Sequence, residues 1–214
     1  MMKFEALILD FGGVLTTPLQ DSMIAFADAE GIELEHLARA ALGAYAGERD
    51  DLVTRFETGK ISETEFATDF AQRLSELSGK EISAEGLVRR IFGGLRLEED
   101  MLDAVAAVKG AGLKTGLLSN SWGINYYPTD RLQPLFDALV ISGEVGMRKP
   151  DPEIFHLTTE KLGVAAEDSV FVDDHPGHLK AAQEIGMTTV LHRSPADTIT
   201  QLEGLLSLDL SGSS

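Results

Sequence analysis

Four groups of polar side chains, far apart in the sequence, could together form one reactive site. Each group ends an apolar segment or lies in a loop close to one: Asp10, Ser119-Asn120, Lys149 and Asp173-Asp174. Taken singly, each group has an ordinary explanation as a turn residue, a helix cap or a solvated surface charge. Taken together, carboxylates, a hydroxyl and a lysine at matching places along the chain indicate a site for chemistry.

The elements that must position these groups are short apolar strands. The sequence predicts five of them, at residues 4–9, 113–118, 138–142, 169–172 and 188–191, with helical patterns at about 101–110, 151–163 and 176–186. This alternation predicts an α/β fold with a Rossmann-like, mostly parallel sheet and helices on both faces. Ligands bind at the carboxyl ends of the strands in such sheets, so the four groups should converge at that edge.

Residues 18–94 interrupt the alternation, because they contain helical patterns and no convincing strand. Ser62 and Glu65 form a capping-box pattern before apolar residues at helical spacing, and Ser83 could cap the next helix. We therefore expect an inserted helical domain of roughly 75 residues. The expected division is 1–17 and 95–210 for the α/β core, 18–94 for the helical cap and 211–214 for a disordered tail.

Composition restricts the class of partner. With 18 basic and 35 acidic residues, the formal net charge of −17 argues against nucleic acid or an anionic membrane as the main partner. A small phosphorylated substrate needs local cations to offset that charge. The chain has no cysteine, which excludes disulfides, thiolate metal sites and cysteine nucleophiles. The apolar run before Asp10 is broken too early for a signal peptide or membrane span, so a cytoplasmic location is the default expectation, and the oligomeric state is unknown.

The motifs around the four groups resemble those of the haloacid dehalogenase-like (HAD) hydrolase superfamily, over nearly the whole chain. The matching strings are Asp-Phe-Gly-Gly-Val-Leu from Asp10, Leu-Leu-Ser-Asn-Ser from Leu117, Gly-Met-Arg-Lys-Pro from Gly146 and Phe-Val-Asp-Asp from Phe171. They look most like the branch of sugar phosphatases and epoxide-hydrolase N-terminal phosphatases. The resemblance implies a Mg²⁺-dependent phosphomonoesterase of small phosphorylated metabolites, with a C1-type helical cap.

The resemblance also implies a nucleophile and a metal site. Asp10 would attack phosphorus and form an aspartyl phosphate, and a carboxylate needs no deprotonation to do so at neutral pH. Mg²⁺ would bind Asp10, the backbone carbonyl of Gly12 and Asp174, which suits its preference for oxygen ligands. Asp173 would orient this site or bind the metal through water.

The remaining two groups would hold the phosphate. In the family pattern Ser119 donates its hydroxyl to the phosphoryl oxygens, helped by the backbone N–H of Asn120 at a helix start. Lys149 would place a positive charge between the nucleophile and the phosphate and stabilise the transition state. Without that charge, the carboxylates would repel the substrate.

Gly12 departs from the family pattern, because most phosphatases of this superfamily carry a second Asp two residues after the nucleophile. That Asp protonates the leaving oxygen and later activates water, a role worth about 10²–10⁴-fold. His175 and His178 are weak candidates for a substitute, since an ordinary histidine titrates near neutral pH. A capping or packing role at a helix start explains His178 better.

Other residues near the four groups allow two interpretations each. Trp122, Tyr126 and Tyr127 follow the second group, and they could stack on the substrate or equally form the seam on which the cap rests. Arg148 could reach a substrate anion or form a salt bridge. Closure of the cap would hinge near residues 16–18 and 93–94.

Two alternatives to a phosphatase follow from the same residues. One is a binding or regulatory protein that has lost turnover through Gly12. The other is a haloacid dehalogenase, in which the same Asp attacks carbon without a metal. The pair Asp173-Asp174 argues against a dehalogenase, because a metal-free site has no use for so much uncompensated negative charge.

Overall fold

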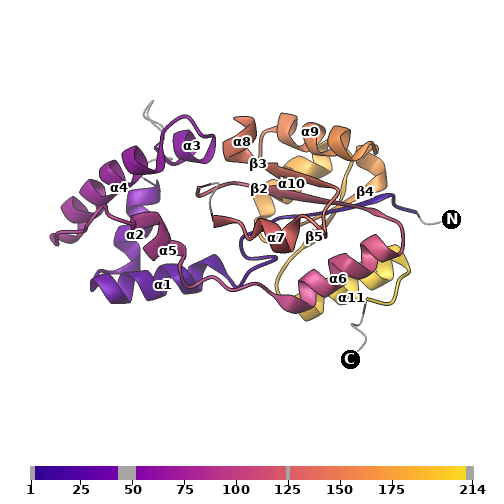
Figure 1. Cartoon of the computed structure of the whole chain (residues 1–214), viewed down its shortest axis with the longest axis horizontal. Helices are drawn as coiled ribbons and strands as arrows, with labels where there is room; N and C mark the ends of the chain where they lie inside the picture. The colour runs from indigo at the N-terminus through magenta and orange to yellow at the C-terminus, as the bar shows by residue number, and fades with distance from the viewer. Residues whose placement is uncertain (1–2, 43–51, 124–125, 211–214) are drawn as a thin grey trace.

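The computed structural model describes residues 3–42, 52–123 and 126–210 (Figure 1). Five parallel strands form one sheet in the order β3-β2-β1-β4-β5. The strands are β1 (Ala6–Leu9), β2 (Lys114–Ser119), β3 (Ala138–Ile141), β4 (Ser169–Asp173) and β5 (Thr188–Leu191). All five sequence-predicted strands are confirmed, with ends that move by a residue or two. The expected disordered tail, 211–214, lies outside the described residues.

Helices cover both faces of this sheet. One face carries α9 (Pro152–Leu162) and α10 (Pro176–Glu184), and the other carries α6 (Glu99–Gly110) and α11 (Pro195–Leu206). Alternate residues of β1 therefore enter two different cores, with Leu7 and Leu9 on the α6 side and Ala6 and Ile8 on the α9 side. The expected α/β fold, Rossmann-like with helices on both faces, is confirmed.

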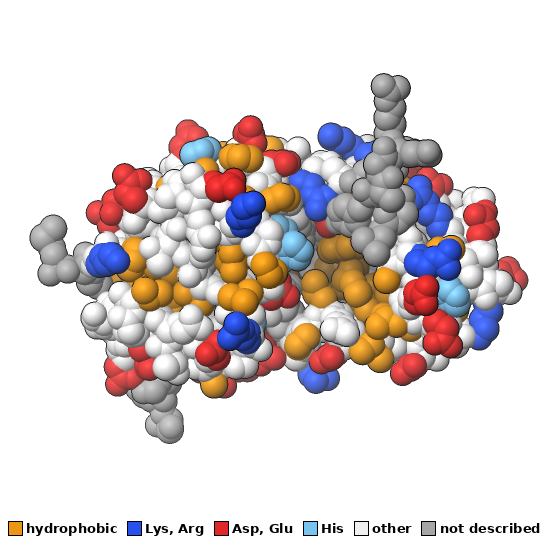
Figure 2. Space-filling view, turned by 180° about the vertical axis from the view of Figure 1, so that it is seen from behind, with side chains coloured by type: hydrophobic (Ala, Val, Ile, Leu, Met, Phe, Trp, Pro, Cys, Tyr) orange, Lys and Arg blue, Asp and Glu red, His pale blue; other side chains and the backbone are white. Residues whose placement is uncertain are grey.

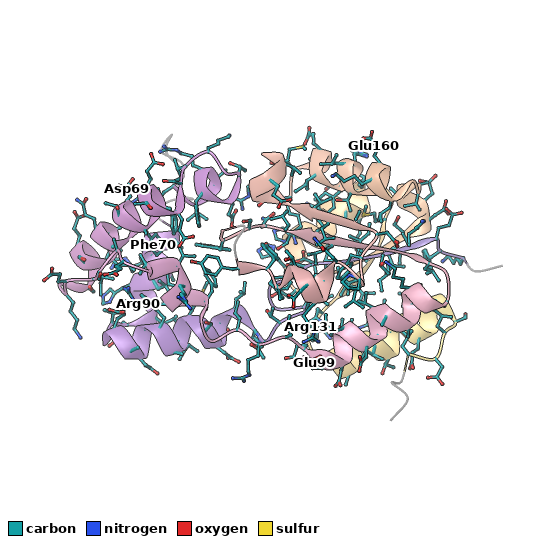
Figure 3. The ribbon with its side chains drawn as sticks, in the orientation of Figure 1. Asp69, Phe70, Arg90, Glu99, Arg131 and Glu160 are labelled. Atoms are coloured by element: carbon teal, nitrogen blue, oxygen red, sulfur yellow. The ribbon has the colours of Figure 1, made fainter. Side chains whose placement is uncertain are left out.

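Three short helices complete this part of the chain. They are α7 (Thr129–Leu132), α8 (Ser142–Val145) and the 3₁₀ helix η2 (Ala166–Asp168). Arg131 of α7 lies 2.7 Å from Glu99 at the start of α6, an exposed ion pair between the two helices (Figure 3). Ser142 was expected to end the third strand, but it begins α8 instead, because its side chain is buried between two backbone groups described below.

The inserted segment forms a separate group of helices at one end of the molecule (Figure 1). These are α1 (Leu19–Glu30), α2 (Leu34–Leu42), α3 (Leu52–Glu57), α4 (Glu63–Ser78) and α5 (Leu87–Phe92). They enclose a hydrophobic core of their own. In the described ranges, the helices are too short or too polar to cross a membrane.

The helix starts of this segment were predicted with mixed success. The capping box of Ser62 and Glu65 is confirmed at the start of α4, where each side chain pairs with the other residue's backbone N–H. Ser83 does not cap α5, which begins after Gly86 in a left-handed conformation. The Ser83 hydroxyl instead accepts a hydrogen bond from the Glu85 N–H, so it stabilises the turn that precedes the helix.

Two linkers join the helical cap to the core, and they run side by side. Thr16 and Leu97 form an antiparallel bridge, the Thr17 N–H donates to the Arg96 carbonyl over 2.8 Å, and the Glu98 N–H donates to the Leu15 carbonyl over 3.0 Å. This paired ribbon is the passage between the two parts. The expected division near residues 17 and 95 stays a prediction, which the position of the ribbon supports.

Candidate active site

The strand register brings the sequence-predicted residues to one edge of the sheet. Leu9 of the central strand pairs with Leu117 on one side and with Val172 on the other. Asp10 therefore follows β1 directly beside Asp173, and its N–H donates to the Val172 carbonyl over 2.9 Å. Ser119 ends the neighbouring strand at the same edge. The convergence that the sequence predicted is present in the structure.

Lys149 joins two of the carboxylates. Its Nζ lies 2.8 Å from Asp10 Oδ1 and 2.7 Å from Asp173 Oδ2, and its side chain has no exposed surface. Burial acts to lower the pKa of Lys149, but the charges of Asp10 and Asp173 outweigh burial and raise it. The lysine is therefore a fixed positive charge between the ends of β1 and β4.

The two paired carboxylates differ in their affinity for a proton. Burial raises the pKa of Asp10 to about 7 against the opposing effect of Lys149. Burial acts in the same direction on Asp173, but Lys149 and a hydrogen bond from His178 hold the pKa of that carboxyl at about 2. Asp173 is thus the permanent counter-ion of the lysine. A pKa of about 7 means that Asp10 is only partly ionised at neutral pH in this structure, whereas the sequence alone predicts a fully ionised carboxylate. A cation bound beside Asp10 would lower that pKa.

A third carboxylate completes an acidic cluster. Ligand oxygens of Asp10, Asp173 and Asp174 all lie within 4.8 Å of one another, and Asp174 is exposed. Gly13 makes this closeness possible. Its φ is +77°, which disfavours other residues, and a Cβ on it would lie 2.5 Å from Asp174 Oδ2, so a larger residue would force the Asp174 carboxylate to shift. The three side chains offer only oxygen ligands, which is the set that a hard divalent cation prefers.

The side chain of Asn120 has a role that the sequence did not predict. Its side-chain amide donates to the Lys149 carbonyl over 3.0 Å and accepts from the Lys149 N–H over 2.8 Å, so it fixes the backbone of the buried lysine. The expected helix start at Asn120 is wrong. A loop follows β2, and the next helix in the described ranges, α7, begins only at Thr129. This loop carries aromatic side chains to the cap and does not form a helix directly after β2.

The two histidines after Asp174 act as structural partners in this structure. His175 precedes α10, and its Nδ1 accepts the Gly177 N–H, which caps the helix. Nδ1 of His178 lies 3.1 Å from both oxygens of Asp173. Burial lowers the pKa of His178. The packing explanation for His178 thus has direct support, since the ring helps to orient Asp173.

The aromatic loop forms much of the seam between core and cap. Trp122 packs into the cap's hydrophobic cluster, with its ring centroid 5.8 Å from that of Phe66 and 5.1 Å from that of Phe92. The Tyr126 hydroxyl donates to Glu63 Oε1 over 2.7 Å. The seam interpretation of Trp122 is therefore confirmed; Trp122 also lines the cleft described below, and stacking on a substrate stays a prediction.

A second seam contains Arg148, which the sequence singled out, together with Glu57, Ser121 and Ser142, which it did not. Arg148 forms an ion pair with Glu57 of α3 over 3.0 Å, and both side chains are largely buried. Ser142 donates to the Glu57 carbonyl and accepts from the Ser121 N–H. Of the two interpretations of Arg148, the salt bridge is the one present. Glu57 gave no signal in the sequence, because a helical pattern does not show which core residue a cap residue will meet.

A cleft of about 890 Å³ opens between the cap and the acidic cluster. Figure 2 shows hydrophobic side chains gathered in a hollow between the two parts of the molecule. Its floor holds the polar residues Asp10, Ser119, Asn120 and Asp174. The walls are mostly apolar and come from both parts, and they include Phe11, Leu19, Met23, Phe92, Leu95 and Trp122. The cleft therefore combines a small charged floor with a large hydrophobic chamber.

Gly12 lies on the floor of this cleft, under the first residue of α1. A Cβ built on Gly12 would lie 3.2 Å from the nearest side-chain atom of Leu19. The space that a catalytic Asp side chain would enter is thus bordered by an apolar residue of the cap.

Comparison with known proteins identifies the family. A family model for haloacid dehalogenase-like hydrolases matches residues 4–186. The chain is 31% identical to bifunctional epoxide hydrolase 2 of Sus scrofa over 225 residues, which cover 98% of this chain but only 40% of that protein. It is 29% identical to the sesquiterpene phosphatase astK of Aspergillus oryzae over 189 residues, which cover 86% of this chain and 87% of that protein.

Solved structures lead to the same family. A HAD family enzyme of Bacteroides thetaiotaomicron in a magnesium complex superposes with a TM-score of 0.65 at 25% identity, covering 89% of this chain and 94% of that one. The resemblance stated from the motifs is thereby confirmed. The chain belongs to the haloacid dehalogenase-like hydrolases.

Proposed function

We propose that this protein is a Mg²⁺-dependent phosphatase that hydrolyses a small phosphate monoester through an aspartyl phosphate at Asp10. The observation that carries the proposal is the buried Lys149, which lies between Asp10 and Asp173 beneath an open cleft. A buried cation among carboxylates can hold an anionic group next to an anionic nucleophile. Membership of a hydrolase family with phosphatase relatives supports the same reaction.

The residues present fit a magnesium ion. Three carboxylates lie within 4.8 Å of one another, and the close approach of Gly13 holds Asp174 over the loop that carries Asp10. Asp10, Asp174 and the Gly12 carbonyl would bind the ion, and Asp173 would act through water or by orienting the others. When bound, the ion would neutralise charge on the phosphate. The magnesium complex of the related HAD family enzyme supports this assignment.

The chain's own residues would divide the remaining work. Asp10 supplies the attacking oxygen, and Lys149 keeps its carboxylate in place over 2.8 Å. The same lysine offsets the negative charge that the substrate brings to a protein of net charge −17. The Ser119 hydroxyl and the Asn120 backbone N–H would donate to the phosphate, while the Asn120 side chain fixes the backbone of Lys149.

The cleft favours an ester of an apolar alcohol. Its walls carry Leu19, Met23, Phe92 and Trp122, so burial of an apolar leaving group there would contribute about 25 cal/mol per Å² removed from water. Gly12 provides no side chain to donate a proton to the leaving oxygen. The similarity to a sesquiterpene phosphatase agrees with a hydrophobic substrate.

Assays with and without metal test the reaction. We expect the purified protein to release phosphate from p-nitrophenyl phosphate with Mg²⁺ and not with a chelator. Asp10→Asn should abolish release while the melting temperature stays close to that of the wild type, because the substitution preserves the shape of the side chain. Unchanged turnover in Asp10→Asn would exclude Asp10 as nucleophile. Absence of turnover with retained binding of Mg²⁺ would favour a binding protein, and release of halide from a haloacid in chelator would favour a dehalogenase.

Comparison of alcohols tests the substrate class. We expect kcat/KM to rise along a series of primary alkyl phosphates of increasing chain length, and to be lower for a sugar phosphate with the same number of carbon atoms. Met23→Glu, on the cleft wall, should reduce that dependence on chain length. Equal kcat/KM for the alkyl and sugar phosphates would contradict a hydrophobic substrate without affecting the proposed reaction.

A further inference from the structure

Tyr127 contacts a proposed phosphate-binding residue from inside the core. Its hydroxyl oxygen lies 2.8 Å from Ser119 Oγ, and both side chains are buried. Tyr127 also lines the cleft beside Asp10. From its place in the sequence, this tyrosine could stack on the substrate or support the cap. The hydrogen bond to Ser119 suggests a third.

The direction of this hydrogen bond follows from the chemistry of the two hydroxyls. A phenol is a stronger acid than an alkyl alcohol, so it is the better donor of the pair. Burial raises the pKa of Tyr127 above its usual range, so the phenol keeps its proton at any working pH. The acidities of the two hydroxyls favour Tyr127 as the donor and Ser119 Oγ as the acceptor, and the Ser121 side chain is a second hydrogen-bond partner of the phenol.

A serine that accepts from Tyr127 has its own proton left to donate. Ser119 Oγ lies 3.4 Å from the Asn120 carbonyl, which is at the long limit of a hydrogen bond. Such a weak contact is easily exchanged for a phosphoryl oxygen. The alternative direction would place the serine proton on the tyrosine oxygen, where it could not reach a substrate.

Packing holds the tyrosine in this position. Its ring belongs to the main hydrophobic core and lies 4.8 Å from the ring of Phe11, which directly follows Asp10. The Tyr127 carbonyl accepts the Thr129 N–H over 2.8 Å, just before α7 begins. The hydroxyl is thus fixed before any ligand arrives, and Ser119 loses little rotational freedom on binding.

We propose that Tyr127 is a positioning residue, whose hydroxyl donates to Ser119 Oγ and so directs the Ser119 proton toward a phosphoryl oxygen bound beside Asp10. The inference rests on the proposed phosphatase function and extends its phosphate site by one residue. It separates Tyr127 from Trp122 and Tyr126 of the same loop, whose partners are in the cap.

A double-mutant cycle tests the proposal. The variants are Tyr127→Phe, Ser119→Ala and the double variant, and the readouts are the Kd for inorganic phosphate with Mg²⁺ and the KM and kcat for p-nitrophenyl phosphate. We expect Tyr127→Phe to raise both Kd and KM by about 2- to 10-fold, the effect of one hydrogen bond. In the Ser119→Ala background the same change should alter them by less than about 2-fold, because no serine remains to be oriented.

Tyr126→Phe is the matched control, since it removes a phenol from the same loop whose partner is Glu63 of the cap. We expect it to leave the Kd for phosphate unchanged. Equal effects of Tyr127→Phe with and without Ser119 would overturn the proposal, as would an unchanged Kd in Tyr127→Phe. Failure of the wild-type protein to bind phosphate or turn over the ester would instead overturn the proposed function on which it rests.

Discussion

Gly12 is the position where one substitution tests how this site handles the leaving group. The related phosphatases that carry Asp here use it to protonate the leaving oxygen, and Gly12 cannot. We predict that Gly12→Asp raises kcat/KM for an alkyl phosphate by about 10²-fold or more, the lower end of the range for a general acid. For p-nitrophenyl phosphate, whose leaving group needs little protonation, kcat/KM should change by less than about 3-fold.

The structure indicates that the substitution will be tolerated. The φ of Gly12 lies outside the left-handed region, so an aspartate can adopt its backbone conformation. A Cβ would contact Leu19 Cδ2 at 3.2 Å and Cδ1 at 3.4 Å, and both atoms end a flexible side chain. Loss of a glycine also restricts the unfolded chain, which stabilises the fold by about 0.4–1 kcal/mol. We therefore expect the free energy of unfolding to change by less than about 1 kcal/mol.

The assay is a comparison of kcat/KM for the two esters in the wild type and three variants. Because kcat/KM reports the steps up to the first irreversible one, it isolates transfer to Asp10 from the later attack of water. Gly12→Asn is the control, since it fills the same space without an acidic proton. Leu19→Ala in the Gly12→Asp background relieves the contact with the cap. A folded Gly12→Asp protein with no gain on the alkyl ester would show that leaving-group protonation does not limit the wild type.

Three further predictions concern stability. Lys149→Met removes the cation from among three carboxylates and should lower the free energy of unfolding by about 3–5 kcal/mol. Addition of Mg²⁺ should restore part of that free energy. A urea titration that shows the same free energy of unfolding as the wild type would contradict the role of Lys149 as counter-ion of these carboxylates. Gly13→Ala should destabilise the fold and weaken Mg²⁺ binding. Gly79→Ala, at a glycine with a similar positive φ but open space around it, should destabilise the fold without changing Mg²⁺ affinity. Equal Mg²⁺ affinity of the two variants would argue against the close approach of Gly13 to Asp174. Burial lowers the pKa of His192, so the imidazole binds a proton more readily in the unfolded chain than in the folded protein. The free energy of unfolding should therefore fall as the pH drops through about 6.5, and His192→Gln should reduce this fall. Denaturant titrations between pH 5 and 7.5 measure it, and the same pH dependence in the wild type and His192→Gln would contradict the prediction.

The sheet and its reactive edge could be predicted because both depend on local patterns. Five short apolar runs, each followed by a glycine or a polar residue, predict buried parallel strands whatever surrounds them. Once the strands are parallel, the residues that follow them must meet at one edge, which is where Asp10, Ser119 and Asp173 lie. The capping box at Ser62 is local in the same sense.

Several features that the sequence did not predict involve residues whose partners are distant in sequence. The Asn120 side chain pairs with the backbone of Lys149, 29 residues further along, which the sequence did not predict. Ser142 begins α8 instead of ending the third strand, and its hydroxyl is buried against the carbonyl of Glu57, 85 residues earlier in the chain. Such pairings depend on the tertiary fold, and the periodicity of a single sequence does not show them. The apolar walls of the cleft could not be predicted for the same reason, because residues such as Leu19 and Met23 could equally well fill the core of the cap.

The central claim is that Asp10 carries the phosphoryl group during turnover, and mass spectrometry after rapid acid quench tests it most directly. The wild-type protein, mixed with p-nitrophenyl phosphate and Mg²⁺ and quenched during turnover, should carry one phosphoryl group on the peptide that contains Asp10, and Asp10→Asn should carry none. The label should disappear when the quenched protein is treated with hydroxylamine, which cleaves acyl phosphates. Phosphate release by the wild type with an unlabelled Asp10 peptide at every quench time, or a label on another residue, would contradict the account.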